Sequence, residues 1–277
     1  MTPDEYCQEK TARSGSSFYY SFLFLPQNQR RAITALYAFC REVDDVVDEC
    51  QDPQIAATKL AWWRQELSGL YAGKPQHPVT QALQAASGEF HLPEEQLQEI
   101  IDGMAMDLQQ TRYLDFKALS LYCYRVASVV GLLAAEIFGY QDRKTQKYAH
   151  DLGLAFQLTN IIRDVGEDAR MGRIYLPIDE LQRFGVPAAD ILNARHSDNF
   201  RRLMEFQIER AEGYYAQAID ELPAIDRRAQ RPGLMMAAIY RTLLDEIRRD
   251  GCQVLTQRTS LTPIRKLWIA WRTWVRG

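Results

Sequence analysis

The stretch NIIRDVGED, residues 160–168, places polar side chains at a regular spacing inside a run with the apolar pattern of a buried helix. Asn160, Asp164 and Asp168 recur every four residues, and Gln157 precedes them by three. On an α-helix, steps of three and four residues share a face, so these four side chains would form one polar stripe. The stripe predicts either a solvated helix face or one wall of a site.

A second stretch, REVDDVVDE at 41–49, repeats the arrangement. On a helix, Tyr37, Arg41, Asp44 and Asp48 fall within an arc of roughly 60°. Like charges four residues apart destabilise a helix slightly, and neither stripe balances its acids with lysines at that spacing. We therefore predict that the two stripes are the two walls of one site, and an ordinary solvated face is the alternative.

The residue types in the two stripes indicate the ligand. Carboxylate and amide oxygens, without histidine or cysteine, suit a hard cation such as Mg²⁺. Arginines beside such a site suit bidentate contacts to phosphate. The combination predicts a phosphate ester bridged by metal ions, held between facing helices of a bundle.

Composition excludes several other classes of protein. The chain has 277 residues and a formal net charge of −3, whereas a generic nucleic-acid binder carries a strongly basic face. Its five cysteines are scattered without a C-x-x-C pair, which argues against a disulfide framework and favours a reducing cytoplasm. The N-terminus is not a signal peptide, and no uninterrupted apolar run reaches the length of a membrane span.

Helical periodicity dominates the chain, and alternating strand patterns are almost absent. We predict one all-α domain over residues 1–277. The predicted helices cover residues 30–50, 54–72, 78–88, 94–110, 116–138, 143–168, 198–221 and 233–256. Residues 170–191, with two prolines and two glycines directly after the second acidic stretch, are predicted to be an irregular binding loop.

The paired stretches resemble the aspartate motifs of the squalene/phytoene synthase family, which joins two isoprenyl diphosphates head to head. The resemblance extends from about residue 6 to about residue 258. Its blocks, in family order, are SGSSFYYSFLFLP (14–26), ALYAFCREVDDVVD (35–48), YCYRVASVVG (122–131), LAFQLTNIIRDVGEDARMGRIYLP (154–177) and YRTLLDEIRR (240–249).

The resemblance implies a single-domain isoprenoid-synthase helical bundle with a central cavity and two acidic walls facing across its mouth. Two or three Mg²⁺ ions, bound with substrate diphosphate, would be held by Asp44, Asp48, Asn160, Asp164 and Asp168. Matched positions that contact diphosphate or shape the reacting centre are Tyr37, Arg41, Gln157, Arg163, Arg173, Tyr175, Tyr240 and Arg258. Ser14, Gly15, Ser16 and Ser17 match a loop for the second diphosphate, and Phe18, Phe22, Tyr122, Val126, Ala127, Val130, Gly131 and Leu158 match substrate-binding or cavity positions.

Within the family, the amino-acid sequences of these blocks most resemble those of bacterial presqualene diphosphate synthases of the hopanoid pathway. The implied reaction is Mg²⁺-dependent condensation of two farnesyl diphosphates to presqualene diphosphate, with release of diphosphate and no NADPH. Phytoene, dehydrosqualene or squalene synthase is the alternative. A di-iron bundle protein would need E-x-x-H pairs, which the sequence lacks, and an inactive scaffold relative would be expected to have lost metal ligands.

The C-terminal stretch TPIRKLWIAWRTWVRG, residues 262–277, predicts an amphipathic helix. Ile264, Leu267, Trp268, Trp271, Trp274 and Val275 would share one side, and Arg265, Lys266, Arg272 and Arg276 the other. Such a helix either packs on the core or lies on anionic lipid with its tryptophans at the headgroups. The second hypothesis predicts a cytoplasmic protein in peripheral contact with the inner membrane face.

Overall fold

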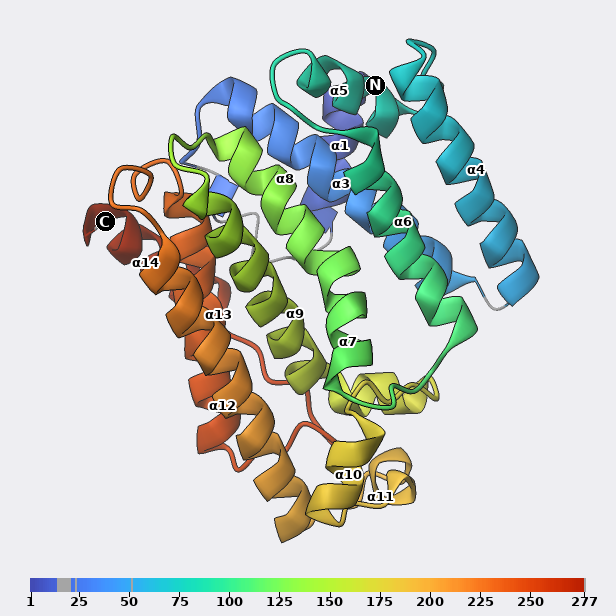
Figure 1. The fold of residues 1–277 in the computed structure, drawn as a ribbon, viewed down its shortest axis with the longest axis vertical. Helices are drawn as coiled ribbons and strands as arrows, with labels where there is room; N and C mark the ends of the chain where they lie inside the picture. The colour runs from blue at the N-terminus through green and yellow to red at the C-terminus, as the bar shows by residue number, and fades with distance from the viewer. Residues whose placement is uncertain (14–20, 23, 51, 277) are drawn as a thin grey trace.

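Helix α9, Lys144–Arg170, carries the second acidic stretch and runs through the middle of the computed structural model (Figure 1). It packs against α12 (Asp198–Glu221) and α8 (Val129–Phe138). It also packs against η1 (Tyr124–Ser128), a π-helical turn between α7 (Phe116–Cys123) and α8. Because neighbours surround α9, its apolar residues are buried, and its polar stripe faces the remaining open side.

The structure describes residues 1–13, 21–22, 24–50 and 52–276. Its other helices are α1 (Pro3–Arg13), α3 (Gln27–Glu49), α4 (Pro53–Tyr71), α5 (Pro78–Ser87), α6 (Glu94–Gln109), α10 (Ile178–Phe184), α11 (Ala188–Leu192), α13 (Arg231–Arg249) and α14 (Pro263–Arg276). No strand forms within these ranges, where the only β contact is an isolated bridge between Arg112 and Ile174. The fold is the expected all-α helical bundle.

The apolar core has two parts, and the two acidic stretches belong to different parts. One part is built from α1, α3, α4, α5, α6 and α8, and the other mainly from α7, α9, α12, α13 and α14. Val126 of η1 packs against both. The acidic face of α3 and that of α9 therefore come together from two separately packed halves.

A glycine sets how closely α9 approaches η1. A Cβ at Gly153 would lie 2.6 Å from the carbonyl oxygen of Ala127 and 2.7 Å from the Cα of Ser128. The Ser128 hydroxyl donates a hydrogen bond to the carbonyl of His150 at 2.8 Å. Only a residue without a side chain lets the two backbones touch here, which fixes α9 against the π-helical turn.

Most of the predicted helices are confirmed with ends within three residues, and the exceptions have physical reasons. The predicted helix 233–256 is too long, because α13 ends at Arg249 and Gly251 and Cys252 adopt φ values of 74° and 59°. Helix α1 was not predicted, because only Cys7 and Thr11 on it are buried and its apolar pattern is weak. The interval 170–191 is not wholly irregular, since α10 and the start of α11 lie within it.

The continuous helical stretch Phe116–Phe138 is long and apolar enough to cross a membrane by length and composition. A search for an uninterrupted apolar run misses this stretch, because Lys117, Arg125 and Glu136 lie within it. In the structure it packs against α3, α6 and α9. These contacts make it one of the packed helices of the bundle.

The close contact at Gly153 generates a stability prediction. Gly153→Ala should lower the free energy of unfolding by about 1–3 kcal/mol, because the added methyl group overlaps the backbone of η1. Gly213→Ala is the matched control, since a Cβ there meets nothing within 4 Å and alanine favours the helix by about 1 kcal/mol. Urea unfolding measures both. Equal effects of the two substitutions would contradict the close contact.

Candidate active site

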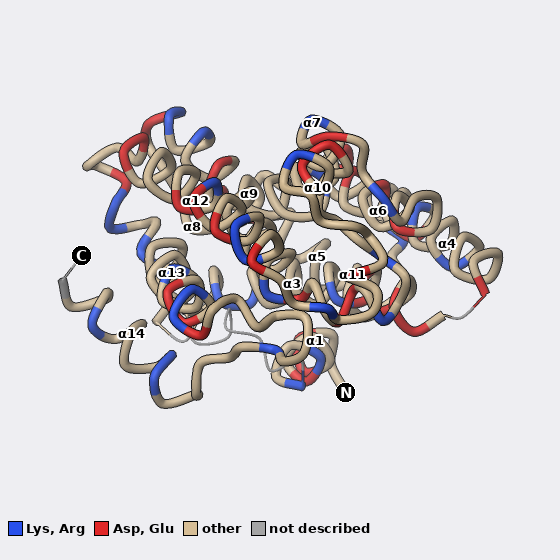
Figure 2. Tube along the Cα trace, turned by 90° about the horizontal axis from the view of Figure 1, so that it is seen from below, with Lys and Arg blue, Asp and Glu red and all other residues tan. Residues whose placement is uncertain are grey.

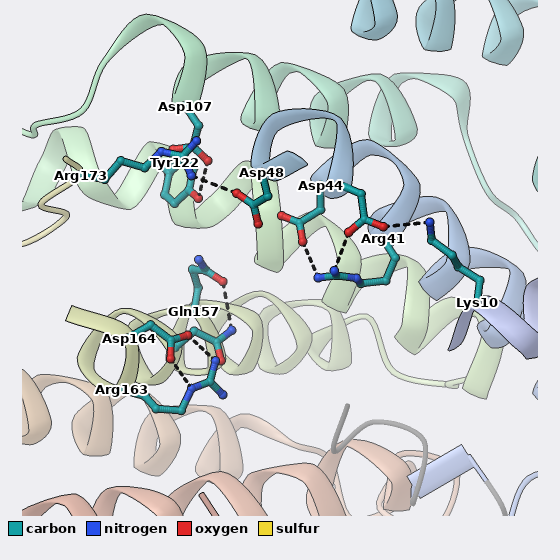
Figure 3. Close-up of polar contacts among 12 residues, drawn as sticks. Lys10, Arg41, Asp44, Asp48, Asp107, Tyr122, Gln157, Arg163, Asp164 and Arg173 are labelled. Carbon is teal, nitrogen blue, oxygen red and sulfur yellow. Dashed lines mark hydrogen bonds and ion pairs between the residues drawn. The ribbon is translucent and has the colours of Figure 1, made fainter. Parts of the chain in front are cut away.

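The face of α3 forms one wall of the site (Figure 3). Arg41 donates to Asp44 at 2.5 Å and to Asp45 at 2.5 Å. Arg173, from the segment after α9, reaches across and donates to Asp48 at 3.0 Å. The wall is therefore a row of carboxylates whose charge is offset by arginines at both ends.

The facing wall belongs to α9, where Asp164 lies across the opening from Asp44 and Asp48 of α3 (Figure 3). Arg163 forms a two-bond ion pair with Asp164, with its Nε at 2.7 Å from Oδ1. Arg258, from the segment after α13, also donates to Asp164 at 2.9 Å and lies 3.3 Å from Glu167. Both walls thus combine carboxylates with arginines, which is the arrangement expected for a metal-bridged phosphate.

A polar cavity of about 360 Å³ separates the walls and joins an apolar cavity of about 170 Å³. The two share Cys40, Val126, Gln157 and Asn160, so the polar mouth opens directly into the apolar interior. The mouth is lined by Arg41, Asp44, Asp48, Asp107, Tyr122, Arg163, Asp164, Asp168, Arg173, Tyr175 and Arg258, among others. One continuous space can accept a molecule with an anionic head and an apolar tail.

The carboxylates at the mouth are electrostatically frustrated. Burial, followed by the charge of Asp48, raises the pKa of Asp44 to about 7. Burial, followed by the charge of Asp164, raises the pKa of Asp168 to about 8. A bound cation would relieve this repulsion, because it favours the ionised form of every carboxylate near it.

The donor set fits a divalent cation held jointly with phosphate oxygens. The Oδ1 atom of Asn160 is buried at the mouth without a hydrogen-bond partner in the described structure, as a ligand oxygen awaiting a cation would be. No three acidic, histidine or cysteine side chains among the described residues are close enough to enclose a metal ion by themselves. Mg²⁺ commonly takes only one or two carboxylates and completes its shell with water and substrate phosphate, so the separated walls suit it.

A second glycine brings the Arg258 segment onto α9. The backbone N–H of Gly166 donates to the carbonyl of Val254 at 3.1 Å. A Cβ on Gly166 would lie 2.4 Å from the carbonyl oxygen of Leu255. Direct backbone contact is what allows Arg258, distant in sequence, to reach Asp164.

The structure places the remaining predicted residues at several depths. Phe22, Tyr37, Val126, Ala127, Val130 and Gly131 line the apolar cavity. Tyr37 therefore lies deeper than Arg41, although the two share a helix face. Tyr240 is buried beside Arg163. Leu158 was predicted to line the cavity but is instead a buried core residue. Ser14, Gly15, Ser16, Ser17 and Phe18 lie outside the described residues.

Two polar residues at the site were not predicted from the sequence. Asp107 of α6 accepts hydrogen bonds from Tyr122 and Tyr175 at the floor of the mouth. Lys266 of α14 lies near the mouth, and burial together with the charges of Arg163 and Arg258 lowers its pKa. The signal for Asp107 was an acid on the apolar face of its helix, whereas the position of Lys266 depends on tertiary packing alone.

Comparison with known proteins agrees with this geometry. Residues 11–265 match the family model of squalene/phytoene synthase. The chain belongs to the squalene/phytoene synthase family. It is 37% identical to 15-cis-phytoene synthase from Synechocystis, covering 99% of this chain and 85% of that protein. It is 38% identical to phytoene synthase from Arthrospira platensis, covering 95% of this chain and 89% of that protein.

Solved structures show the same fold. A dehydrosqualene synthase in complex with a ligand superposes with a TM-score of 0.90 at 29% identity, covering 99% of this chain and 96% of that chain. Squalene synthase HpnC from Alicyclobacillus acidocaldarius superposes with a TM-score of 0.80 at 30% identity, covering 90% of this chain and 94% of that chain. The family and its prenyltransferase chemistry are thus confirmed, whereas the special resemblance to presqualene diphosphate synthases is not.

The frustrated carboxylate at Asp168 generates a prediction in which stability and activity move in opposite directions. Because its pKa is raised in the folded state, the folded protein holds a proton that the unfolded chain releases. Stability should therefore fall as pH rises from about 4 to about 8. Asp168→Asn should remove this loss of stability. At pH 8.5 without divalent metal, it should raise the free energy of unfolding by a few kcal/mol, since each unit of pKa shift corresponds to about 1.4 kcal/mol before screening by solvent.

The same variant should lose about 100-fold or more in turnover, the scale for removing one electrostatic contact to a transition state. Urea unfolding at pH 5 and pH 8.5, with a diphosphate-release assay, measures both effects. Asp245→Asn, an exposed aspartate on α13, is the control and should change neither. A variant that is less stable than the parent at pH 8.5 would refute the frustration.

Proposed function

We propose that the protein catalyses the Mg²⁺-dependent head-to-head condensation of two isoprenyl diphosphates. The observation that supports this most strongly is the continuity of the charged mouth with the apolar cavity through Val126, Gln157 and Asn160. A diphosphate head would lie between the acidic walls while its prenyl chain extends among apolar side chains. Family membership supports this class of substrate.

Each part of the site has a role in this reaction. Asp44 and Asp48 on α3, with Asn160, Asp164 and Asp168 on α9, would hold the metal ions, which supply Lewis-acid neutralisation of the departing diphosphate when bound. Arg41, Arg163, Arg173 and Arg258 would bind its oxygens, exchanging their present carboxylate partners for phosphate. The apolar lining would keep water from the allylic cation that forms when the C–O bond breaks.

The chain length of the substrate separates two candidates. The relatives named above, at 37–38% identity over nearly the whole chain, are phytoene synthases. They favour two geranylgeranyl diphosphates as substrates and phytoene as the product, and this is the first candidate. They favour it over presqualene diphosphate synthase, the assignment expected from the wording of the sequence blocks.

Presqualene diphosphate formation from two farnesyl diphosphates is the second candidate. A specific observation keeps it: the superposed structures with TM-scores of 0.90 and 0.80 are a dehydrosqualene synthase and a squalene synthase, both named for the shorter carbon skeleton. Both candidates share ionisation, coupling and cyclopropane closure. Neither needs a reductant, so NADPH should leave the rate unchanged.

Incubation with each substrate separately decides between the candidates. With geranylgeranyl diphosphate, a phytoene synthase should release one diphosphate per substrate consumed and yield a hydrocarbon. With farnesyl diphosphate, a presqualene diphosphate synthase should release one diphosphate per two substrates and retain the other in its product. Mass spectrometry and a diphosphate assay measure both. Chelation of Mg²⁺ should abolish either reaction, and full activity in the chelator would refute the proposed function.

We further propose that the enzyme works at the cytoplasmic face of the inner membrane, docked through α14. The inner face of this helix packs on the core: Ile269 and Ala270 are buried, and Trp274 stacks on Phe24 at 5.2 Å. Helical spacing grouped Trp274 with apolar residues of α14 that are exposed, but in the structure it packs on the core. The outer face carries apolar residues that are 45–82% exposed, namely Ile264, Leu267, Trp268, Trp271 and Val275.

Charge and position support a lipid surface as the occupant. Helix α14 carries arginine and lysine but no acidic residue (Figure 2). Arg231 lies over the ring of Trp274, and the neighbouring Pro232 and Gly233 line the apolar cavity. The docking face is therefore next to the space that would hold the prenyl chains, and anionic lipid matches both its apolar and its basic character.

Vesicle co-sedimentation tests the docking. The full chain should sediment with vesicles containing anionic lipid more than with neutral ones. Trp268→Ser with Trp271→Ser should reduce that binding about tenfold or more, since burial of each ring contributes more than about 1.4 kcal/mol. Ile55→Ser with Leu121→Ser removes exposed apolar side chains elsewhere and is the control. Equal binding of all three proteins would exclude α14 as the docking surface.

A further inference from the structure

Asp107 is a buried carboxylate at the floor of the mouth, outside the two acidic stripes (Figure 3). It lies on α6 and is only 9% exposed. Its Oδ1 accepts a hydrogen bond from the Tyr175 hydroxyl at 2.8 Å, and its Oδ2 accepts one from the Tyr122 hydroxyl at 2.9 Å. Each carboxylate oxygen therefore accepts one hydrogen bond from a phenol, and this single side chain fixes the direction of both hydroxyl groups.

The surroundings of Asp107 disfavour its ionised form. Asp44 and Asp48 of α3 and Asp168 of α9 face it with like charge, whereas Arg173 and the two phenols favour its ionised form. Tyr113, which precedes α7, and Cys123 of α7 also lie near it. Burial is the main cause that raises the pKa of Asp107, to about 6. A neutral residue would be easier to bury, so the retained charge indicates a use.

The two phenols belong to a stack of aromatic rings. The Tyr175 ring stacks on that of Tyr122 at a centroid distance of 5.2 Å and on that of Tyr113 at 5.9 Å. Tyr122 is four residues before Val126, which lines both cavities, so its ring lies where the mouth meets the apolar space. A positive charge at this junction would meet ring faces and phenolic oxygens whose protons point away from it.

We propose that Asp107 is a positioning residue, which orients the hydroxyl groups of Tyr122 and Tyr175 and polarises their rings so that they stabilise the carbocation. The proposal rests on the proposed function. Hydrogen bonding to an anion makes a phenol more electron-rich, and an electron-rich ring attracts a cation more strongly. Asp107 also keeps both O–H groups from pointing a positive hydrogen at the cation. It touches neither the metal ligands nor the substrate in this arrangement.

Asp107→Asn tests the proposal with little change in volume. An asparagine offers one acceptor oxygen instead of two, so one phenol must turn its proton elsewhere. We expect kcat to fall about 10- to 30-fold, the size of one desolvated cation–π contribution, while KM changes less than about threefold. The parent enzyme at saturating Mg²⁺ should lose activity as pH falls through about 6, and the variant should lack that dependence.

A double-mutant cycle separates orientation of the phenols from a merely structural role. Tyr122→Phe with Tyr175→Phe keeps the rings and removes both hydroxyl groups. In that background Asp107→Asn should change kcat less than about threefold, because nothing remains for Asp107 to orient. An equal loss of kcat in both backgrounds would overturn the proposal. The Phe pair alone must lower kcat, so an unchanged rate in that variant would overturn it as well.

Asp226→Asn is the matched control. Asp226 is 1% exposed and lines neither cavity. It accepts hydrogen bonds from the backbone N–H groups of Gln141 and Asp142 and from the Thr145 hydroxyl. It should lower stability but leave kcat and its pH dependence intact. Failure of the two ideas is distinguishable: a parent enzyme that releases no diphosphate from any isoprenyl diphosphate refutes both, whereas an active parent with an equally active Asp107→Asn variant refutes only the role of Asp107.

Discussion

Burial of carboxylates beside other carboxylates, on both α3 and α9, is the constraint on which the site depends. Asp44 on α3 and Asp168 on α9, whose pKa values are raised by burial and by neighbouring acids, line the same mouth. Without a cation, such carboxylates favour the protonated form. Packing of the two core halves, including the backbone contact at Gly153, holds them in place. The packing of the core thus holds an unfavourable arrangement of carboxylates that a cation and a diphosphate would complete.

The arginines give the mouth two states of similar charge balance. Without substrate, Arg41, Arg163, Arg173 and Arg258 pair with the carboxylates of the walls. With metal and diphosphate bound, the carboxylates would pair with the metal and the arginines with the phosphate oxygens, so few charges would be left unpaired in either state. The apolar cavity behind the mouth would then confine the reactive cation, and the tyrosines bonded to Asp107 lie at the boundary between the two environments.

Sequence analysis predicted those parts of the fold and of the site that depend only on residue spacing along one helix. The four-residue recurrence of Asn160, Asp164 and Asp168 sufficed to place them on one helix face, and the apolar period located most helices. Periodicity could not show that α13 stops at Arg249, where a left-handed turn begins, nor that weakly apolar residues form α1. Asp107 was marked in the sequence only as an acid on the apolar face of its helix, and Lys266 reaches the site through tertiary packing, so spacing alone assigned neither residue to the site.

Calorimetric titration with inorganic diphosphate tests most directly whether the two walls form one metal-dependent site. Diphosphate should bind the parent protein tightly with Mg²⁺ and at least about tenfold more weakly without it. Asp48→Asn and Asp164→Asn, one in each wall, should each weaken the Mg²⁺-dependent binding, and their effects should be non-additive because both act on one bridged ligand. Binding that is indifferent to Mg²⁺, or unaffected by the substitution in either wall, would contradict a site shared between α3 and α9.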